Sequence, residues 1–319
     1  MINKFQNSML IRRPSVGLVL SGGGARGLAH IGVLRVLERE GIPVDYLAGS
    51  SMGGVIAAGY AAGMSSCDLE REALAATRKR HMLRLADPGL PNGGLIRGQQ
   101  LLAFFEQEFG EKTFSDLRLP LALIAVDLNS HREIVLREGS VAMALRATTS
   151  LPGLFTPVEM NDWRLVDGGL LNNLPVDVAK RTGAEIVIAV DISQNRDEGI
   201  GHWIGNQRWI PSGISATLDV LDESLSTLII AARENKLRQY PPNVFIQPDL
   251  PININSVAGY GRVEELITAG ERATEEHLGE IKTLLRPNWH WPLSGEMYCA
   301  DSSLVQPPSP ETKPEKYES

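Results

Sequence analysis

The sequence predicts an α/β protein in which a largely parallel β-sheet is covered by helices on both faces. Short apolar runs alternate with helical segments along the whole chain, which is the pattern of such folds. Two of the runs, 16–20 (VGLVL) and 185–191 (EIVIAVD), lack the polar alternation of a strand with one face in water. Glycine-rich turns at 22–27 and 49–53 follow predicted strands, as expected at strand-to-helix connections.

The first half of the chain predicts two strand–turn–helix units in succession. The strand 16–20 ends at the first glycine-rich turn and is followed by an amphipathic helix. The segment 45–48 leads into the second turn. The helix after it, 55–62, has no polar face, so we expect it to be buried on all sides.

The remaining elements continue the alternation. Further helices are predicted at 66–86, 99–109, 141–148, 175–181, 214–238 and 263–285. Hairpins are predicted where 121–126 meets 133–136 and within 158–166, and the last strands are 185–191 and 244–247.

Length and charge restrict the functional classes. A chain of 319 residues suits one large α/β domain or two small ones. The net charge of −7 argues against a nucleic-acid-binding protein, because such proteins usually carry a basic face. The basic N-terminal segment has no apolar region of signal-peptide length.

The cysteines and one uncharged stretch indicate the cellular compartment in which we expect the protein. Cys67 and Cys299 are far apart and fit neither a disulfide framework nor a metal site, which favours a reducing compartment. The stretch 46–67 is uncharged and about long enough to span a bilayer, but its five glycines favour a buried strand–turn–helix. We therefore expect a cytoplasmic protein without a transmembrane span.

The turn Gly49-Ser50-Ser51-Met52-Gly53 matches the G-x-S-x-G pattern of a nucleophile elbow. Small residues are needed there because the turn is strained and crowded. Ser51 is the candidate nucleophile, and the Met52 amide is a candidate donor to an oxyanion. The alternative is a tight turn that contains a serine without catalytic function.

The first turn consists of the residues Gly22, Gly23, Gly24, Ala25, Arg26 and Gly27. Glycines let several backbone N–H groups point at one anion, so an oxyanion hole and a dinucleotide phosphate site both fit. The dinucleotide interpretation needs an acidic residue at the end of the second strand, and Asp45 precedes that strand instead. A tight turn without a ligand is the third alternative.

A third motif, Asp167-Gly168-Gly169, follows a predicted strand. It is either an ordinary Asp-Gly turn or a carboxylate presented at a strand end, where the glycines would let Ser51 approach.

The histidines offer no persuasive partner for Ser51. The six histidines are His30, His81, His131, His202, His277 and His290. None of them lies in a segment with the pattern of a strand followed by an exposed loop with small neighbours. His290 follows the last helix, where an α/β-hydrolase carries its triad histidine. A Ser-His-Asp esterase that uses His290 or His30 therefore stays an alternative, as do an acyltransferase and a nucleotide- or anion-binding protein.

Taken together and in order, the motifs resemble the bacterial patatin-like phospholipases, in particular compact members related to the catalytic domain of neuropathy target esterase. The matching segments are GGGARG at 22–27, GSSMG at 49–53, RATTSLPGLFTPV at 146–158, and DGG at 167–169 followed by NNLPVDVAK. The resemblance covers about 14–285 and implies a three-layer α/β/α patatin-like fold. It leaves an N-terminal arm, 1–13, and a tail rich in proline, serine and charge, 286–319.

The resemblance implies a lipid acyl hydrolase with a Ser-Asp dyad, in which Ser51 is the nucleophile and Asp167 its base. The amides of the 22–27 loop would form the oxyanion hole, and no metal or organic cofactor is required. The substrate would be a lipid ester, a phospholipid or a lysophospholipid, with peripheral contact at a membrane. The family's frequent DGA is DGG here, a change that we expect to leave the carboxylate undisturbed. Burial of Asp167 would raise its pKa from about 4 and make it a better base.

The helix 99–109 has a bulky apolar face. Two interpretations stay open: a lip for an acyl chain or membrane, and a stripe that packs on the core. The residues concerned are Leu101, Leu102, Phe104, Phe105 and Phe109.

Overall fold

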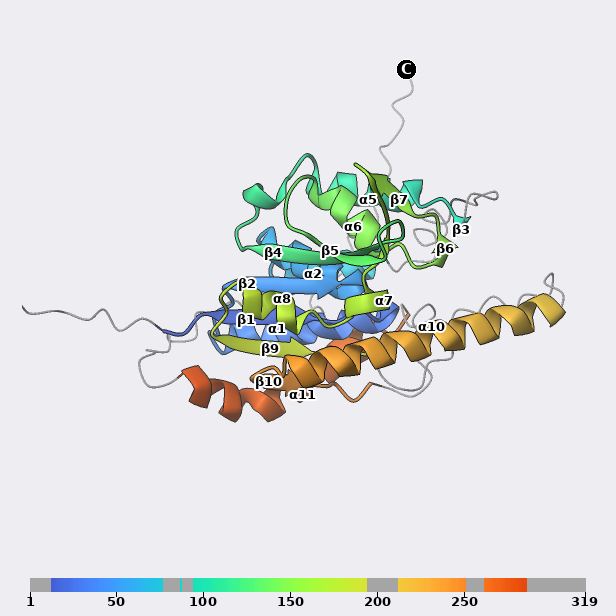
Figure 1. The fold of residues 1–319 in the computed structure, drawn as a ribbon. Coiled ribbons are helices and arrows are strands. Elements are labelled where there is room, and N and C mark those ends of the chain that lie inside the picture. Colours follow the sequence, from blue (N-terminus) through green and yellow to red (C-terminus); the bar gives the residue numbers. More distant parts are fainter. Residues whose placement is uncertain (1–12, 77–86, 88–93, 194–211, 251–260, 286–319) are drawn as a thin grey trace, which may run out of the picture.

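The computed structural model describes residues 13–76, 87, 94–193, 212–250 and 261–285. The tail 286–319, and the arm except Arg13, lie outside the described residues. The central sheet has eight strands in the order β10-β9-β1-β2-β4-β8-β7, with β5 also paired to β4 (Figure 1). The strands are β1 (Val16–Leu20), β2 (Tyr46–Ser50), β4 (Leu121–Asp127), β5 (Arg132–Leu136), β7 (Val158–Met160), β8 (Trp163–Asp167), β9 (Ile186–Val190) and β10 (Val244–Ile246).

The helices alternate with these strands. They are α1 (Ala29–Arg39), α2 (Ser51–Ala61), α3 (Ser66–Ala76), α5 (Gln99–Phe109), α6 (Val141–Thr148), α7 (Gly169–Asn172), α8 (Val176–Arg181), α10 (Ser212–Gln239) and α11 (Val263–Leu285). Two 3-10 turns are η1 (Gly24–Leu28) and η2 (Phe114–Asp116), and a separate two-stranded sheet joins β3 (Gly94–Ile96) to β6 (Gly153–Phe155).

The sheet is parallel from β10 to β4, β5 and β8 pair with β4 in the antiparallel direction, and β7 pairs antiparallel with β8. Successive residues of β1 point to opposite faces, as the strand period requires. Leu18 and Leu20 join the core under α1, α2, α5, α6 and α11. Val19 joins a second cluster with α8 and the end of α10. The predicted helical layers on both faces are therefore confirmed.

Strand β4 brings two other strand ends together. Its residues 121–124 pair with β2 and its residues 125–127 pair with β8, while β5 pairs with 123–127. Since β5 overlaps both partners, it occupies one edge of β4, and β2 and β8 share the other edge. They meet head to head there, with Ser50 opposite Ile124 and Asp167 opposite Ala125.

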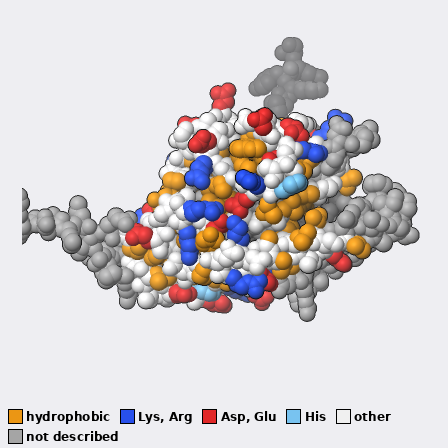
Figure 2. All heavy atoms as spheres, viewed as in Figure 1, with side chains coloured by type: hydrophobic (Ala, Val, Ile, Leu, Met, Phe, Trp, Pro, Cys, Tyr) orange, Lys and Arg blue, Asp and Glu red, His pale blue; other side chains and the backbone are white. Residues whose placement is uncertain are grey.

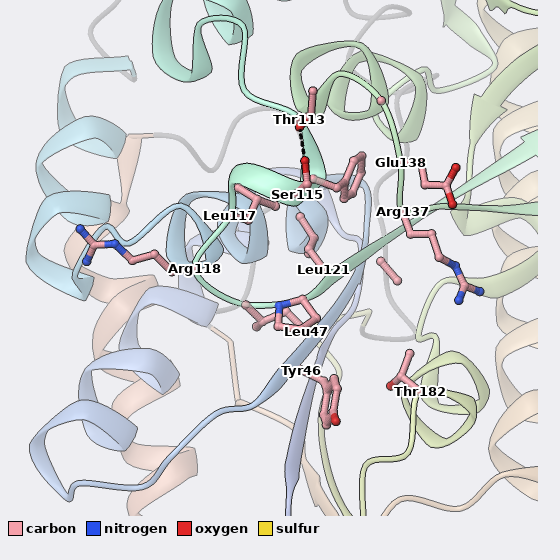
Figure 3. Close-up of a pocket in the computed structure, with 14 residues that line it drawn as sticks. Tyr46, Leu47, Thr113, Ser115, Leu117, Arg118, Leu121, Arg137, Glu138 and Thr182 are labelled. Atoms are coloured by element: carbon pink, nitrogen blue, oxygen red, sulfur yellow. Dashed lines mark hydrogen bonds between the residues drawn. The ribbon is translucent and has the colours of Figure 1, made fainter.

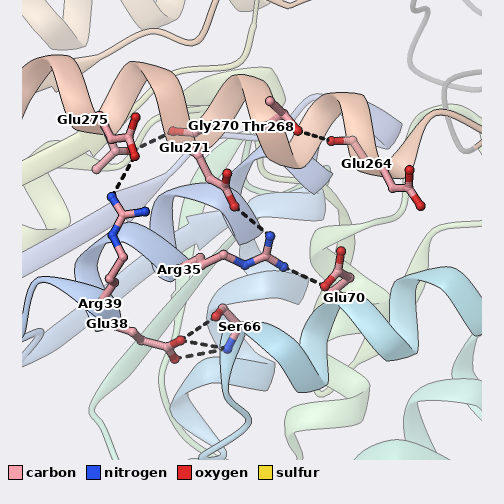
Figure 4. A network of polar contacts seen from close by, with 11 residues as sticks. Arg35, Glu38, Arg39, Ser66, Glu70, Glu264, Thr268, Gly270, Glu271 and Glu275 are labelled. Carbon is pink, nitrogen blue, oxygen red and sulfur yellow. Dashed lines mark hydrogen bonds and ion pairs between the residues drawn. The ribbon is translucent and has the colours of Figure 1, made fainter. Parts of the chain in front are cut away.

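Helix α1 is held between α3 and α11 by ion pairs (Figure 4). Arg35 bonds Glu271 of α11 at 2.7 Å and Glu70 of α3 at 2.6 Å. Helices α1 and α11 also approach closely. A methyl group added at Gly270 of α11 would lie 1.9 Å from the carbonyl oxygen of Ala29 in α1. This packing fixes α1 and, with it, the glycine-rich turn that precedes it.

On the opposite face, Lys236 joins α10 to the sheet. Its ammonium group bonds Glu133 of β5 at 2.9 Å and the fully buried Asp177 of α8 at 2.8 Å. Figure 2 shows basic and acidic side chains interspersed with apolar ones on the face in view.

Several details differ from the sequence-based predictions. The short elements β3, β6 and α7 were not predicted, because three or four residues carry too little periodicity to detect. Helix α3 extends to Ala76, and the rest of the predicted helix 66–86 lies outside the described residues. Among the described residues, no helix is both long and apolar enough to cross a bilayer.

The prediction that the two cysteines take no part in a disulfide is wrong. Cys67 in α3 is disulfide-bonded. The only other cysteine of the sequence, Cys299, lies outside the described residues. Separation along the chain does not measure distance in a fold, so the inference of a reducing compartment loses its support.

The close contact between α1 and α11 can be tested with a pair of glycines on the same helix. Gly270→Ala forces a methyl group against backbone and should lower the free energy of unfolding by about 3 kcal/mol. Gly279→Ala meets nothing within 4 Å and should raise it by up to about 1 kcal/mol. Urea unfolding measures both, and equal effects would contradict the described packing.

Candidate active site

Ser51 lies at the turn from β2 into α2, as its first helical residue. Its φ of 51° is in the left-handed region, which is strained for a residue with a side chain. This conformation is typical of a nucleophile elbow. The Ser51 amide donates a hydrogen bond to the hydroxyl oxygen of Thr148, at 3.0 Å.

The glycine-rich turn at the end of β1 contacts this serine. A methyl group added at Gly22 would lie 3.0 Å from the Ser51 Cβ, and one at Gly53 would lie 2.3 Å from the Leu20 carbonyl oxygen. One at Gly27 would lie 2.3 Å from the Cγ of Met52. The G-x-S-x-G and GGGARG motifs therefore need glycines because the two turns pack directly on each other.

Asn173 braces the glycine-rich turn. Its carbonyl oxygen accepts the Gly22 N–H at 3.2 Å, and its side-chain amide donates to the Gly22 carbonyl at 3.2 Å. Gly24 has a φ of 56° and starts η1, and the buried Arg26 donates from Nε to the Gly23 carbonyl at 3.4 Å. Because the Gly22 N–H already has a partner, Gly23 and Gly24 are the better candidate donors to an anion.

Asp167 ends β8 and is 4% exposed. Its carboxylate accepts a hydrogen bond from the Gly169 N–H at 2.8 Å and interacts with the Ser51 hydroxyl. Burial raises the pKa of Asp167 from 3.8 to about 6, although both hydrogen bonds favour the charged form. A methyl group at Gly168 would lie 2.3 Å from the Ile124 carbonyl oxygen, so this position also requires a close backbone approach.

The structure thus brings together the residues that the three motifs predicted, with Gly49, Gly53 and Gly169 as backbone around them. It also shows contacts that were missed: Thr148 on the Ser51 amide, Asn173 on the glycine turn, and the Ser150 carbonyl on the Asp167 N–H at 2.9 Å. All three residues lie in segments that were quoted for the family resemblance. Their position in those segments was the available signal.

The described histidines do not contact Ser51 or Asp167. His30 is buried and its Nε2 bonds the Ser21 carbonyl at 2.9 Å, while burial lowers its pKa to about 4. His277 bonds the Ala273 carbonyl within α11. His131 is exposed in the turn after β4. His81, His202 and His290 lie outside the described residues.

Two other candidate groups have structural partners. Asp45 bonds the Arg13 guanidinium and the Val16 N–H at the amino end of β2, the opposite end of the strand from the glycine turn. It is therefore badly placed for a dinucleotide ribose.

The apolar face of α5 packs on the core. Phe105 and Phe109 are core residues, and Leu101, Leu102 and Phe104 are partly buried against the same core, which supports core packing over an apolar lip.

A cavity of about 630 Å³ lies at the other end of the sheet (Figure 3). It is lined by Tyr46 and Leu47 at the start of β2, by Leu121 at the start of β4, and by Arg118 and Arg137. Ser51 follows the last residue of β2, and a five-residue strand spans about 17 Å. This cavity is therefore separate from the candidate active site.

The protein-family profile of the patatin-like phospholipases matches residues 18–180, just over half of the chain. The chain belongs to this family. An uncharacterised NTE family protein of Mycobacterium tuberculosis is 33% identical over 284 residues, which cover 85% of this chain and 48% of that protein. A protein of Neosartorya fischeri named lysophospholipase is 30% identical to this chain. The matched region covers 84% of this chain and 18% of that protein.

The chain therefore spans half or less of the length of these curated relatives. Among solved structures, it is similar to VipD from Legionella pneumophila, with a TM-score of 0.46 and 14% identity over 85% of this chain and 67% of VipD. The type III effector ExoU gives a TM-score of 0.40 at 15% identity, over 85% of this chain and 53% of ExoU.

The buried carboxylate predicts an unusual dependence of stability on pH. Because the pKa of Asp167 is higher in the folded chain, at about 6, than the ordinary 3.8, the folded state loses stability as pH rises through this window. Asp167→Asn cannot ionise. The difference in free energy of unfolding, variant minus wild type, should therefore increase between pH 4 and pH 7. We expect an increase on the order of 3 kcal/mol in favour of the variant.

Asp127 provides a control of opposite sign. Its pKa is lowered to about 2, first by the Ser130 hydroxyl, so its stabilising effect is lost only below about pH 4, and Asp127→Asn should be less stable than wild type at both pH 4 and pH 8. Urea unfolding at pH 4 and pH 8 measures both variants. A difference between Asp167→Asn and wild type that does not change with pH would contradict the raised pKa.

Proposed function

We propose that this chain is a serine lipid acyl hydrolase of the lysophospholipase type, with Ser51 as nucleophile and Asp167 as its base. The observation that carries the proposal is the meeting of β2 and β8 on one edge of β4, which sets the Ser51 hydroxyl beside a buried carboxylate. Membership of the patatin-like phospholipases supports the reaction class, and the relatives named lysophospholipase support the substrate class.

In the proposed first step, Ser51 Oγ attacks the ester carbonyl carbon while its proton passes to the Asp167 carboxylate. The pair of electrons from the carbonyl bond moves to the oxygen and forms a tetrahedral oxyanion. The bond to the leaving alcohol then breaks, and the alcohol oxygen takes the proton back from Asp167. The product is an acyl ester on Ser51.

The proposed oxyanion donors are the amides of Gly23 and Gly24 with that of Met52, the residue after the nucleophile. The contact between the glycine turn and Ser51 supports this assignment. Gly22 has a supporting role instead, since its N–H is bonded to Asn173. The brace by Asn173 keeps the turn in place before substrate binds, and such preorganisation is what makes an oxyanion hole effective.

In the proposed second step, water attacks the acyl carbon as Asp167 accepts its proton. The tetrahedral intermediate collapses, Ser51 Oγ leaves and takes the proton from Asp167, and the free fatty acid is released. A carboxylate with a pKa near 6 is a stronger base than a solvated aspartate and is still ionised at neutral pH. The dyad thus performs both steps without a histidine.

We further propose that the substrate enters from a lipid surface. Leu171, in the short helix after Asp167, is 37% exposed. A single exposed leucine is ordinary on a protein surface, so this proposal rests on membership of the patatin-like phospholipases.

Covalent labelling and fatty-acid release test the assignment of Ser51. A fluorophosphonate probe should modify Ser51, and purified protein should release fatty acid from lysophosphatidylcholine. Ser51→Ala should abolish both activities, and Asp167→Asn should slow release by about 100-fold or more. Ser50→Ala is the matched control, because the Ser50 hydroxyl is buried and has no hydrogen-bond partner among the described residues. Full activity in Ser51→Ala would refute the proposal.

The pKa of Asp167 also sets the expected pH profile. The base must be ionised, so the rate of labelling should rise with pH, reach half its maximum near pH 6 and level off above about pH 7. His290→Ala should leave this profile unchanged. If His290→Ala abolishes labelling instead, the result would support the Ser-His-Asp alternative.

A further inference from the structure

Thr148, the last residue of α6, connects the nucleophile to the central sheet. Its hydroxyl oxygen accepts the Ser51 N–H at 3.0 Å and its proton goes to the Ile124 carbonyl at 2.5 Å. The side chain is fully buried, and its methyl group lies 3.4 Å from the position of a Cβ at Gly54. One hydroxyl group thus satisfies a donor and an acceptor that are both enclosed in the protein.

The position of this bond in the sheet explains why it is needed. Ile124 is the last residue of β4 that pairs with β2, and Ala125 is the first that pairs with β8. The Thr148 hydroxyl therefore binds β4 at the junction where the two strand ends meet. It also holds the amide of a residue with a strained φ of 51°, which needs such support to persist.

The same segment reaches the other member of the dyad. The Ser150 carbonyl accepts the Asp167 N–H at 2.9 Å, so residues two apart hold the backbones of both Ser51 and Asp167. Arg146 fixes this segment in turn. Its buried guanidinium donates to the Ser150 hydroxyl, to the Gly98 carbonyl at 2.9 Å and to the Thr156 carbonyl at 2.9 Å.

We propose that Thr148 is a positioning residue that sets the geometry of the Ser51–Asp167 dyad through its hydroxyl group. This inference rests on the proposed function, since it takes Ser51 as the nucleophile. The hydroxyl acts on the backbone of the elbow, so its loss changes the alignment of the Ser51 side chain with Asp167. The effect belongs to the chemical step and leaves substrate binding unchanged.

Three substitutions separate the hydroxyl from the rest of the side chain. Thr148→Val keeps the shape but places a methyl group against an amide and a carbonyl, and we expect kcat to fall about 100-fold with KM within about twofold. Thr148→Ser restores the hydroxyl and should keep kcat within about threefold of wild type. Thr149→Val is the matched control, because among the described residues the Thr149 hydroxyl donates only within α6, to the carbonyls of Leu145 and Arg146.

The experiment measures kcat and KM for lysophosphatidylcholine, together with the rate of fluorophosphonate labelling and thermal unfolding. A merely structural role would lower the unfolding temperature but leave the labelling rate of the folded protein unchanged. If Thr148→Val does not fold, Thr148→Ala is judged by the same criteria. Wild-type labelling and kcat in the hydroxyl-free variant, or a loss that Thr148→Ser does not restore, would overturn the inference. A wild-type protein that is not labelled at Ser51 would instead refute the proposed function.

Discussion

The arrangement of the candidate site depends on the pairing of one edge of β4 with two different strands. Parallel β2 pairs with the first part of that edge and antiparallel β8 with the last part, so their carboxyl ends face each other. Ser51 and Asp167 are separated by more than a hundred residues, yet each directly follows or ends one of these strands. Backbone pairing, and no feature of the side chains themselves, brings the two together.

This arrangement stores unfavourable free energy at the site. Ser51 has a backbone conformation that costs on the order of 1–3 kcal/mol, and Asp167 is ionised at neutral pH although it is buried. Thr148 holds the Ser51 amide, and the hydrogen bonds from the Gly169 N–H and the Ser51 hydroxyl favour the charged form of Asp167. Strain and a raised pKa in the same small region are expected where a protein performs chemistry.

Much of this arrangement could be predicted from the sequence, because long periodic segments and glycine-rich turns are local signals. The helix 263–285 and the hairpin of β4 and β5 are confirmed, as is the layering on both faces of the sheet. The three-residue strands β3 and β6 could not be predicted, since they depend on contacts between distant segments. The segment of Thr148 was quoted for the family resemblance, but its contact with Ser51 depends on the β2–β8 junction and could not be predicted from the sequence.

The central claim is that Ser51 and Asp167 form a catalytic dyad at the edge of β4. A crystal structure of the protein inactivated with a fluorophosphonate tests it most directly. We expect phosphorus bonded to Ser51 Oγ, the Asp167 carboxylate adjacent to that oxygen, and the phosphoryl oxygen bound by the amides of Gly23, Gly24 and Met52. Phosphorus on another residue, or a histidine in the place assigned to Asp167, would contradict it.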